Sequence, residues 1–180
     1  MLKKILIGLA VVIVGFLVVV ALQPSQYRVA RTAHIAAPPE ALFPYVNDLH
    51  KFQVWNPWAK IDPAAKQTFD GPEAGIGAVS AWESKEIGDG RMTIVESRPN
   101  ELVRYKMEFL KPFASTASAD ITLKVEGNQT IVTWGMSGEN NFLCKAMGLL
   151  MSMDKMVGDE FAKGLASLKK ITEGAQSAPK

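Results

Sequence analysis

Glu96 carries the carboxylate in this sequence that is best suited to general acid–base chemistry. It follows Met92 and Ile94 at a spacing of two, so in a strand all three side chains would point to one face of the sheet. A carboxylate buried on that face would have a raised pKa and could exchange a proton with a bound molecule. The alternative is a position at the rim, where Glu96 would pair with Arg98 or Arg104.

The other reactive side chains lie in sequence contexts that are less typical of catalytic residues. His34 lies in a predicted strand, where an ordinary sheet residue is a simpler interpretation than a catalytic base. Cys144 is the only cysteine, which excludes an internal disulfide, and its apolar surroundings favour a packed thiol. With His50 as the only other histidine, no metal-ligand spacing appears, so we expect neither a metal nor another cofactor. Glu96 and His34 are thus the catalytic candidates, without a catalytic motif around them.

Aromatic and methionine residues give a stronger signal, because large soft side chains line apolar ligand pockets. Trp55 and Trp58 flank an Asn-Pro pair in a segment that looks irregular, which indicates a cover over a cavity. An ordinary core would use the same residue types. The side chains that we expect to contact a ligand are Trp55, Trp58, Trp82, Met92, Tyr105, Met107, Trp134, Met147 and Met153.

A β-meander must position most of these residues. From Thr68 onward, glycines recur every few residues with extended runs between them, which is typical of short antiparallel strands. A short helix is predicted over 40–47, followed by an irregular segment. The predicted strands cover 27–35, 78–83, 91–97, 102–109, 117–126 and 129–138.

One long amphipathic helix is predicted over 141–173, where apolar residues recur at spacings of mostly three and four. A curved sheet wrapped around this helix would bury its apolar stripe together with the inner faces of the strands. The fold class is therefore α+β.

Residues 5–22 form an apolar run without a charged residue. As a helix, its 18 positions would span about 27 Å, close to the bilayer's hydrocarbon thickness of about 30 Å. A cleaved signal peptide is the alternative, but its apolar region is usually only about 7 to 15 residues long. Lys3 and Lys4 precede the run and favour a cytoplasmic N-terminus, while Arg28 and Arg31 beyond it weaken this orientation. We expect a retained single-pass anchor in a bacterial inner membrane, with the domain outside the cytoplasm.

The net positive charge of the chain comes from its N-terminal lysines. The formal net charge is +2, and once Lys3 and Lys4 are set aside, 18 basic residues balance 18 acidic ones. A protein that binds nucleic acid through phosphates needs a basic surface, so nucleic acid is excluded as a partner.

Five segments resemble a known family in their order and spacing. They read HIAAPPEALFPYVNDLHKFQVWNPW, GPEAGIGAVSAW, GDGRMTIVESRPNELVRYKMEF, TIVTWGMSG and GDEFAKGLASLKK. The sequence resembles the SRPBCC superfamily, also called START-like or Bet v 1-like, and within it the polyketide cyclase/dehydrase-type proteins. The resemblance implies a helix-grip fold, in which a seven-stranded antiparallel sheet surrounds the C-terminal helix and leaves a cavity between them. Members bind hydrophobic ligands, act as enzymes or bind protein partners, so the fold alone does not select a function.

We therefore expect three segments: an N-terminal anchor with its linker over 1–26, an SRPBCC domain over 27–173 and a flexible tail over 174–180. The leading hypothesis is a membrane-tethered domain that binds a small hydrophobic or lipid-like ligand. One alternative is a cyclase or hydrolase that uses Glu96 or His34. The other is a module that binds a membrane-protein partner.

Overall fold

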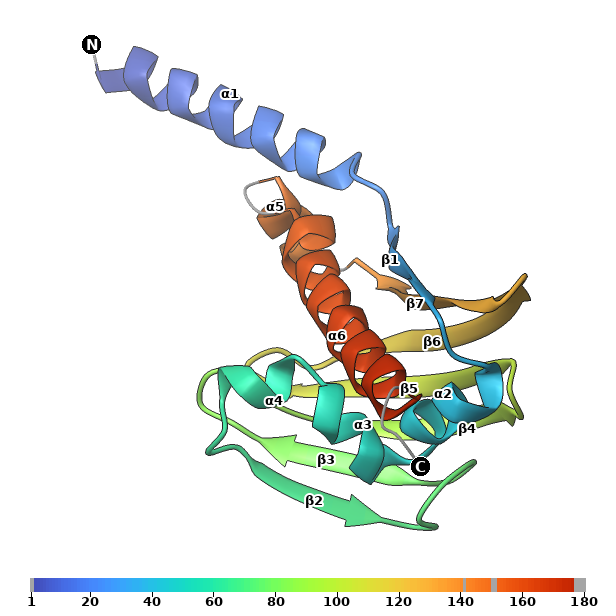
Figure 1. The fold of residues 1–180 in the computed structure, drawn as a ribbon. Helices are drawn as coiled ribbons and strands as arrows, with labels where there is room; N and C mark the ends of the chain where they lie inside the picture. The colour runs from blue at the N-terminus through green and yellow to red at the C-terminus, as the bar shows by residue number, and fades with distance from the viewer. Residues whose placement is uncertain (1, 141, 150–151, 177–180) are drawn as a thin grey trace.

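The structure is a computed structural model that describes residues 2–140, 142–149 and 152–176 (Figure 1). Its helices are α1 (Leu2–Ala21), α2 (Pro39–Asn47), α3 (Leu49–Trp55), α4 (Trp58–Ile61), α5 (Phe142–Gly148) and α6 (Met153–Gln176). Its strands are β1 (Gln26–Ile35), β2 (Lys66–Asp70), β3 (Val79–Glu83), β4 (Asp89–Arg98), β5 (Leu102–Lys111), β6 (Ser115–Glu126) and β7 (Gln129–Glu139).

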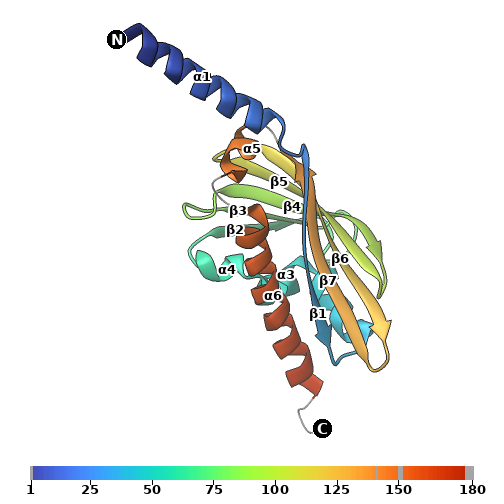
Figure 2. The same ribbon diagram turned by 90° about the horizontal axis from the view of Figure 1, so that it is seen from above.

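The seven strands form one antiparallel sheet in the order β1-β7-β6-β5-β4-β3-β2. Strand β6 shows why the sheet has an inner and an outer face: Ala119, Ile121 and Leu123 are buried, and the residues between them are partly exposed. Figures 1 and 2 show the sheet curving around α6. The predicted α+β helix-grip architecture is confirmed.

Helix α6 supplies a large part of the core. Its buried side chains include Phe161, Leu165 and Leu168, which pack in the same cluster as Val29 and Trp134 of the sheet. Full burial of each large apolar side chain contributes about 1.5 to 3 kcal/mol to folding. The helix therefore holds the two sides of the curved sheet together.

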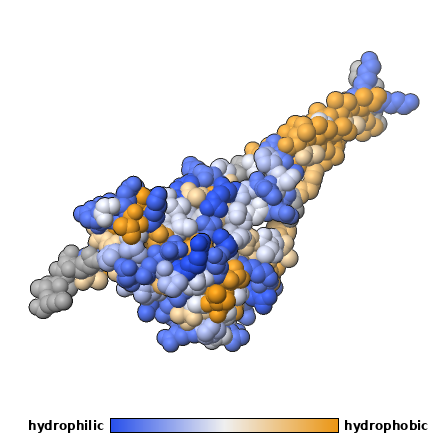
Figure 3. Space-filling view, turned by 90° about the vertical axis from the view of Figure 1, so that its right-hand side faces the viewer, coloured by the Kyte–Doolittle hydropathy of each residue, from blue (hydrophilic) through white to orange (hydrophobic). Residues whose placement is uncertain are grey.

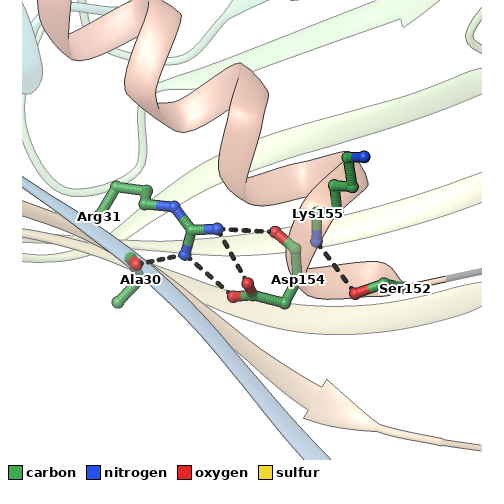
Figure 4. Close-up of polar contacts among 5 residues, drawn as sticks. All are labelled: Ala30, Arg31, Ser152, Asp154 and Lys155. Atoms are coloured by element: carbon green, nitrogen blue, oxygen red, sulfur yellow. Dashed lines mark hydrogen bonds and ion pairs between the residues drawn. The ribbon is translucent and has the colours of Figure 1, made fainter.

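An ion pair holds the beginning of α6 against β1 (Figure 4). The guanidinium of Arg31 donates to both carboxylate oxygens of Asp154 at 2.9 Å and to the carbonyl oxygens of Asp154 and Ala30. The absence of a side chain at Gly158 makes room for this guanidinium, because a Cβ there would lie 2.1 Å from Nη2. A side chain at position 158 would therefore displace the guanidinium from Asp154.

The predicted single helix over 141–173 is wrong, because α5 and α6 are separate helices. Helix α5 ends at Gly148, a residue type that terminates helices readily. Ser152 then caps α6, since its Oγ accepts a hydrogen bond from the Lys155 amide at 3.3 Å (Figure 4). Apolar spacing continues across this junction, so the spacing alone did not reveal the break.

The segment between β1 and β3 is more regular than predicted. Helix α3 begins after Asp48, whose carboxylate accepts hydrogen bonds from the amides of His50 and Lys51. Helix α4 and strand β2 follow, where an irregular segment and a glycine-rich connection were expected. Helices α2, α3 and α4 cover one side of the space enclosed by the sheet (Figures 1 and 2).

Helix α1 projects away from the domain, and Figure 3 shows the apolar surface along most of its length. It is the one helix of the described residues that is long and apolar enough to cross a membrane, a property that signal sequences share. Its last turn contacts the domain, where Val20 is fully buried. Most other α1 side chains are exposed.

Candidate functional site

A cavity of about 200 Å³ lies between the sheet, α6 and the segment of α3 and α4. Its deep part is formed by buried side chains such as Tyr105 and Phe161. Half-buried side chains such as Ala59, Ile87 and Val157 mark its mouth. Since an apolar cavity of about 150 Å³ holds benzene, this one has room for a six-carbon ring or chain.

Aromatic rings form one side of the cavity. Trp134 stacks on Phe161 with ring centroids 4.2 Å apart, and Trp58 meets both rings edge-on at 5.8 and 5.9 Å. Trp82 and Phe109 form a second edge-on pair at 6.4 Å. Such contacts restrict the rings to few orientations, so this apolar surface is largely preformed.

Four polar side chains also line the cavity, and we call Gln53, Asn56, Gln67 and Ser80 the polar wall. The Ser80 Oγ accepts hydrogen bonds from the Nε2 atoms of both Gln53 and Gln67. Asn56 donates to Oε1 of Gln53 at 3.0 Å and accepts from the Trp58 amide at 3.2 Å. These bonds connect α3, β2 and β3 at the edge of the cavity.

Tyr105 is buried in the deep part of the cavity, and burial raises the pKa of its phenol well above the usual value. Its hydroxyl donates to the carbonyl oxygen of Val46. The ring therefore presents an apolar surface to the cavity, while its polar atom is bonded to α2.

Asp62 is the charged residue among the described residues that line the cavity. A hydrogen bond from the Ser84 hydroxyl is the main cause that lowers the pKa of its carboxyl group, and backbone amides including that of Ala64 add to the effect. The carboxylate is therefore ionised at neutral pH. In the described part of the chain, no cluster of three or more His, Cys, Asp or Glu residues could hold a metal ion.

Six of the nine side chains predicted to contact a ligand line this cavity. They come from α4, β3, β4, β5 and β7, and their contact with a ligand is still a prediction. They are Trp58, Trp82, Met92, Tyr105, Met107 and Trp134.

The other three predicted side chains are placed differently. Trp55 does not line the cavity, because it is fully buried behind Phe52 and Trp134, with its Nε1 donating to the carbonyl oxygen of Tyr45. Met153 begins α6 and is 38% exposed, outside the lining. The side chain of Met147 on α5 lies outside the described residues.

Glu96 does not share the buried face of β4 with Met92 and Ile94, and it does not line the cavity. The pairing of β4 with β5 shifts between Ile94 and Glu96, and this irregularity breaks the alternation of two. The carboxylate pairs instead with Arg104 on β5 and with Arg98 at 3.2 Å. This is the rim alternative considered for Glu96 from the sequence.

His34 also lies outside the cavity lining. Its side chain is 56% exposed on β1, and its Nδ1 is 4.0 Å from Oε2 of Glu126. This is the position of an ordinary residue of the outer face of the sheet.

Sequence reasoning missed several residues of the site. Ser80 precedes Trp82 by two positions and Met136 follows Trp134 by two, so alternation along the strands was a signal that pointed to both. Val157 and Phe161 are separated by four on α6, which places them on one helix face. The polar residues of α3 carried no comparable signal, because this short helix was not predicted.

The cavity lies toward the end of the sheet where α1 enters, which we call the α1 end. At this end Gln26 of β1 pairs with Glu139 of β7, and Ser115 of β6 pairs with Phe109 of β5. Phe109 is itself a lining residue, as is Ile87 in the β3–β4 connection. Cavity and α1 are therefore on the same side of the domain.

Comparisons with known proteins place this geometry in a family. Residues 26–173 match the family model described as polyketide cyclase / dehydrase and lipid transport. No curated protein matches the chain.

Solved structures have the same fold at low sequence identity. The Aha1 dimer from Colwellia psychrerythraea has a TM-score of 0.59 and 17% identity, with 82% of this chain and 96% of that chain covered. Protein CV1439 from Chromobacterium violaceum has a TM-score of 0.59 and 16% identity, covering 84% and 99%. Protein Ms6760 from Mycobacterium smegmatis has a TM-score of 0.58 and 14% identity, covering 82% and 92%. The family match and the helix-grip fold together show that the chain belongs to the polyketide cyclase/dehydrase and lipid transport family of the SRPBCC superfamily.

Proposed function

We propose that this chain is a membrane-tethered binding domain that holds a small hydrophobic or amphipathic molecule in the cavity between the sheet and α6. The observation that carries this proposal is the cavity of about 200 Å³ with its preformed aromatic side. Ligand sites are typically concave and mostly apolar, with a few convergent polar groups. Lipid transport, which the family description names, is consistent with such a ligand.

The proposed tether is α1. Its length and apolar surface suit a bilayer, and Lys3 and Lys4 at its beginning favour a cytoplasmic N-terminus, with the domain in the periplasm of a bacterium. Since the cavity lies toward the α1 end of the sheet, a molecule that leaves the bilayer would have a short path to its mouth.

Acid–base catalysis on a molecule in the cavity is less well supported. The carboxylate of Glu96 pairs with Arg98 and Arg104, and the imidazole of His34 is on the outer face of the sheet. Neither group lines the cavity. Binding without chemistry therefore accounts for the site with fewer assumptions.

A thermal-shift screen of small apolar and amphipathic compounds tests the proposal, with the full chain held in lipid nanodiscs. Ala119→Leu serves as the filled-cavity variant, because Ala119 is a buried lining residue. Ala81→Leu is the matched control, since Ala81 pairs with the exposed Arg91 on the outer face of the sheet. We expect compounds that raise the melting temperature of the wild type and of Ala81→Leu but not of Ala119→Leu.

Two outcomes would contradict the proposal. One is that no compound stabilises the wild type. The other is that Ala119→Leu responds as strongly as the wild type while both variants retain their ligand-free melting temperatures, which would place binding elsewhere.

A further inference from the structure

We infer that the cavity selects molecules with an uncharged, hydrogen-bonding head group and excludes carboxylates of the same chain length. This inference rests on the proposed function, because it names the class of ligand for the same cavity. It follows from the donors and acceptors of the polar wall and from the charges that surround them.

The polar wall has at least one donor and one acceptor available for a ligand. The Ser80 Oγ accepts from Gln53 and Gln67, and no described residue accepts a hydrogen bond from its hydroxyl hydrogen. Likewise, in the described part of the chain no group donates to Oε1 of Gln67. A ligand hydroxyl or amide can donate to Gln67 and accept from Ser80, which a hydrocarbon cannot do.

Position makes the Ser80 hydroxyl significant. Ser80 is 1% exposed. Its partner on the neighbouring strand β4 is Met92, whose buried side chain also lines the cavity. At this exposure a ligand head reaches the hydroxyl only when the Gln53 or Gln67 side chain moves aside, and the bond from Gln53 is the longer of the two at 3.4 Å.

Among the described residues, the same surroundings offer a carboxylate no cationic partner. No arginine, lysine or histidine occurs among the described residues that line the cavity, and the one charged side chain is the carboxylate of Asp62. Removing an anion from water without a cationic partner is costly, and a second carboxylate nearby adds repulsion. A carboxylate ligand must therefore leave its head outside or bind protonated.

The apolar tail of the ligand has a defined place on the side of the cavity formed by β7 and α6. Trp134, Phe161 and Met136 line that side, and their surfaces contain rings and a thioether. Head and tail would thus be bound by different sides of one cavity, which fixes the direction of the ligand.

Titrations with 1-hexanol and hexanoate near neutral pH test the inference. The full chain is placed in lipid nanodiscs and dialysed against each probe, so that affinity refers to the free aqueous concentration. All four tryptophans lie in the domain and three line the cavity, so their fluorescence reports on occupancy. We expect 1-hexanol to bind at least about tenfold more tightly than hexanoate, because the anion is desolvated without a partner.

Two variants locate the head group. The Ser80→Ala variant should weaken 1-hexanol binding about three- to tenfold, the loss expected for one hydrogen bond. Ser118→Ala is the matched control, because Ser118 lies on the outer face of the sheet and pairs with Ser137. It should bind 1-hexanol as the wild type does.

The outcomes separate this inference from the proposed function. If both probes bind with equal affinity, if hexanoate binds better, or if Ser80→Ala leaves the affinity for 1-hexanol unchanged, the inference is wrong while a ligand-binding cavity stands. If neither these probes nor any compound of the thermal-shift screen binds, the proposed function fails, and the inference fails with it.

Discussion

Trp134 connects the core of the protein to its cavity. One face of its ring stacks on Phe161, and the edges of Trp55 and Trp58 meet it from α3 and α4. Its side chain is only 4% exposed, yet it lines the cavity. The aromatic side of the site is therefore as rigid as the core, and the inferred selectivity depends on the polar wall.

A cation placed in the polar wall should reverse the preference for uncharged heads. We predict that Gln67→Lys raises the affinity for hexanoate about tenfold or more, because a hydrogen bond to a charged group contributes about 1.5 to 3 kcal/mol. The same variant should bind 1-hexanol less tightly, since Oε1 of Gln67 is lost. Dialysis titrations in nanodiscs measure both affinities.

Thr68→Lys is the matched control for this charge change. Thr68 is the next residue of β2 and is exposed, so its side chain points away from the polar wall. An equal gain in hexanoate affinity in Thr68→Lys would mean that net charge, not the wall, sets the preference.

The ion pairs of Glu108 lead us to predict a specific pH dependence of the protein's stability. Hydrogen bonds from Arg91 and Lys106 lower the pKa of its carboxyl group from 4.5 to about 2. Because the folded-state pKa is the lower one, the stabilisation is present above pH 4.5 and is lost as the pH falls toward about 2. Glu108→Gln should lower the melting temperature at neutral pH and should flatten its decrease over this acidic range.

Thermal melts of the wild type and Glu108→Gln measure this difference. Between about pH 6 and pH 8 it should be constant, since Glu108 is ionised there in both the folded and unfolded states. A difference that persists unchanged down to about pH 2 would show that the ion pairs with Arg91 and Lys106 contribute nothing.

At the scale of elements, the close approach of α6 to the sheet depends on Gly164. A Cβ at this position would lie 2.7 Å from the Trp134 ring and 3.1 Å from Pro57. Both neighbours are rigid and packed, so neither can move without disturbing the aromatic side of the cavity. The helix therefore uses a residue with poor helix propensity where its backbone contacts tryptophan.

We predict that Gly164→Ala destabilises the protein by about 1 to 2 kcal/mol, because overpacking costs about 1 to 3 kcal/mol and the gain in helix propensity is at most about 1. Gly174→Ala is the matched control in the same helix, where nothing lies within 4 Å of a Cβ. It should be neutral or slightly stabilising. Urea unfolding measures the change in the free energy of unfolding of both variants. Equal changes at the two positions would contradict the packing argument.

Sequence pattern predicted the strands better than the short elements. Apolar and polar residues alternate in β6 because one face of the sheet is buried, and glycines mark the turns between strands. Six of the strands were therefore predicted near their observed bounds. Strand β2 and helix α3 are too short to show a period, and the capping role of Asp48 was not considered. The shift near Glu96 arises from pairing with β5, which alternation within β4 cannot reveal.

The candidate site was predictable in part for the same reason. Large residues on long strands, such as Trp82, Met107 and Trp134, could be identified as cavity candidates from type and spacing. Whether a tryptophan faces a cavity or the solid core depends on packing between elements. This packing places Trp58 in the cavity lining and Trp55 in the core. The polar wall combines α3, β2 and β3, and only tertiary structure brings these together.

At the scale of the whole molecule, the proposed tether α1 would place the domain next to a membrane. The linker between Ala21 and Gln26 is short, and the buried Val20 contacts the domain, so a membrane that contains α1 would lie close to the α1 end of the sheet. The cavity lies toward this end. A neutral domain gains no net electrostatic attraction to anionic lipid, so the proposed tether depends on α1.

We predict that the full chain stays with membranes through an alkaline carbonate wash, while a chain that begins at residue 24 is recovered in the aqueous fraction with the same far-UV circular dichroism per folded residue. The mass of the purified full chain should include residues 5–22. A mature chain that begins near residue 22 and fractionates as soluble would show that α1 is a cleaved signal.

Methyl NMR of methionine tests the occupancy of the cavity most directly. The chain has eight methionines, of which Met92, Met107 and Met136 line the cavity and Met153 and Met156 are exposed on α6. With methyl-labelled methionine in the nanodisc-bound chain, saturating 1-hexanol should shift the resonances of the three lining methionines and leave those of Met153 and Met156 in place. Unchanged resonances of Met92, Met107 and Met136, or equal shifts of all five, would contradict a ligand in this cavity.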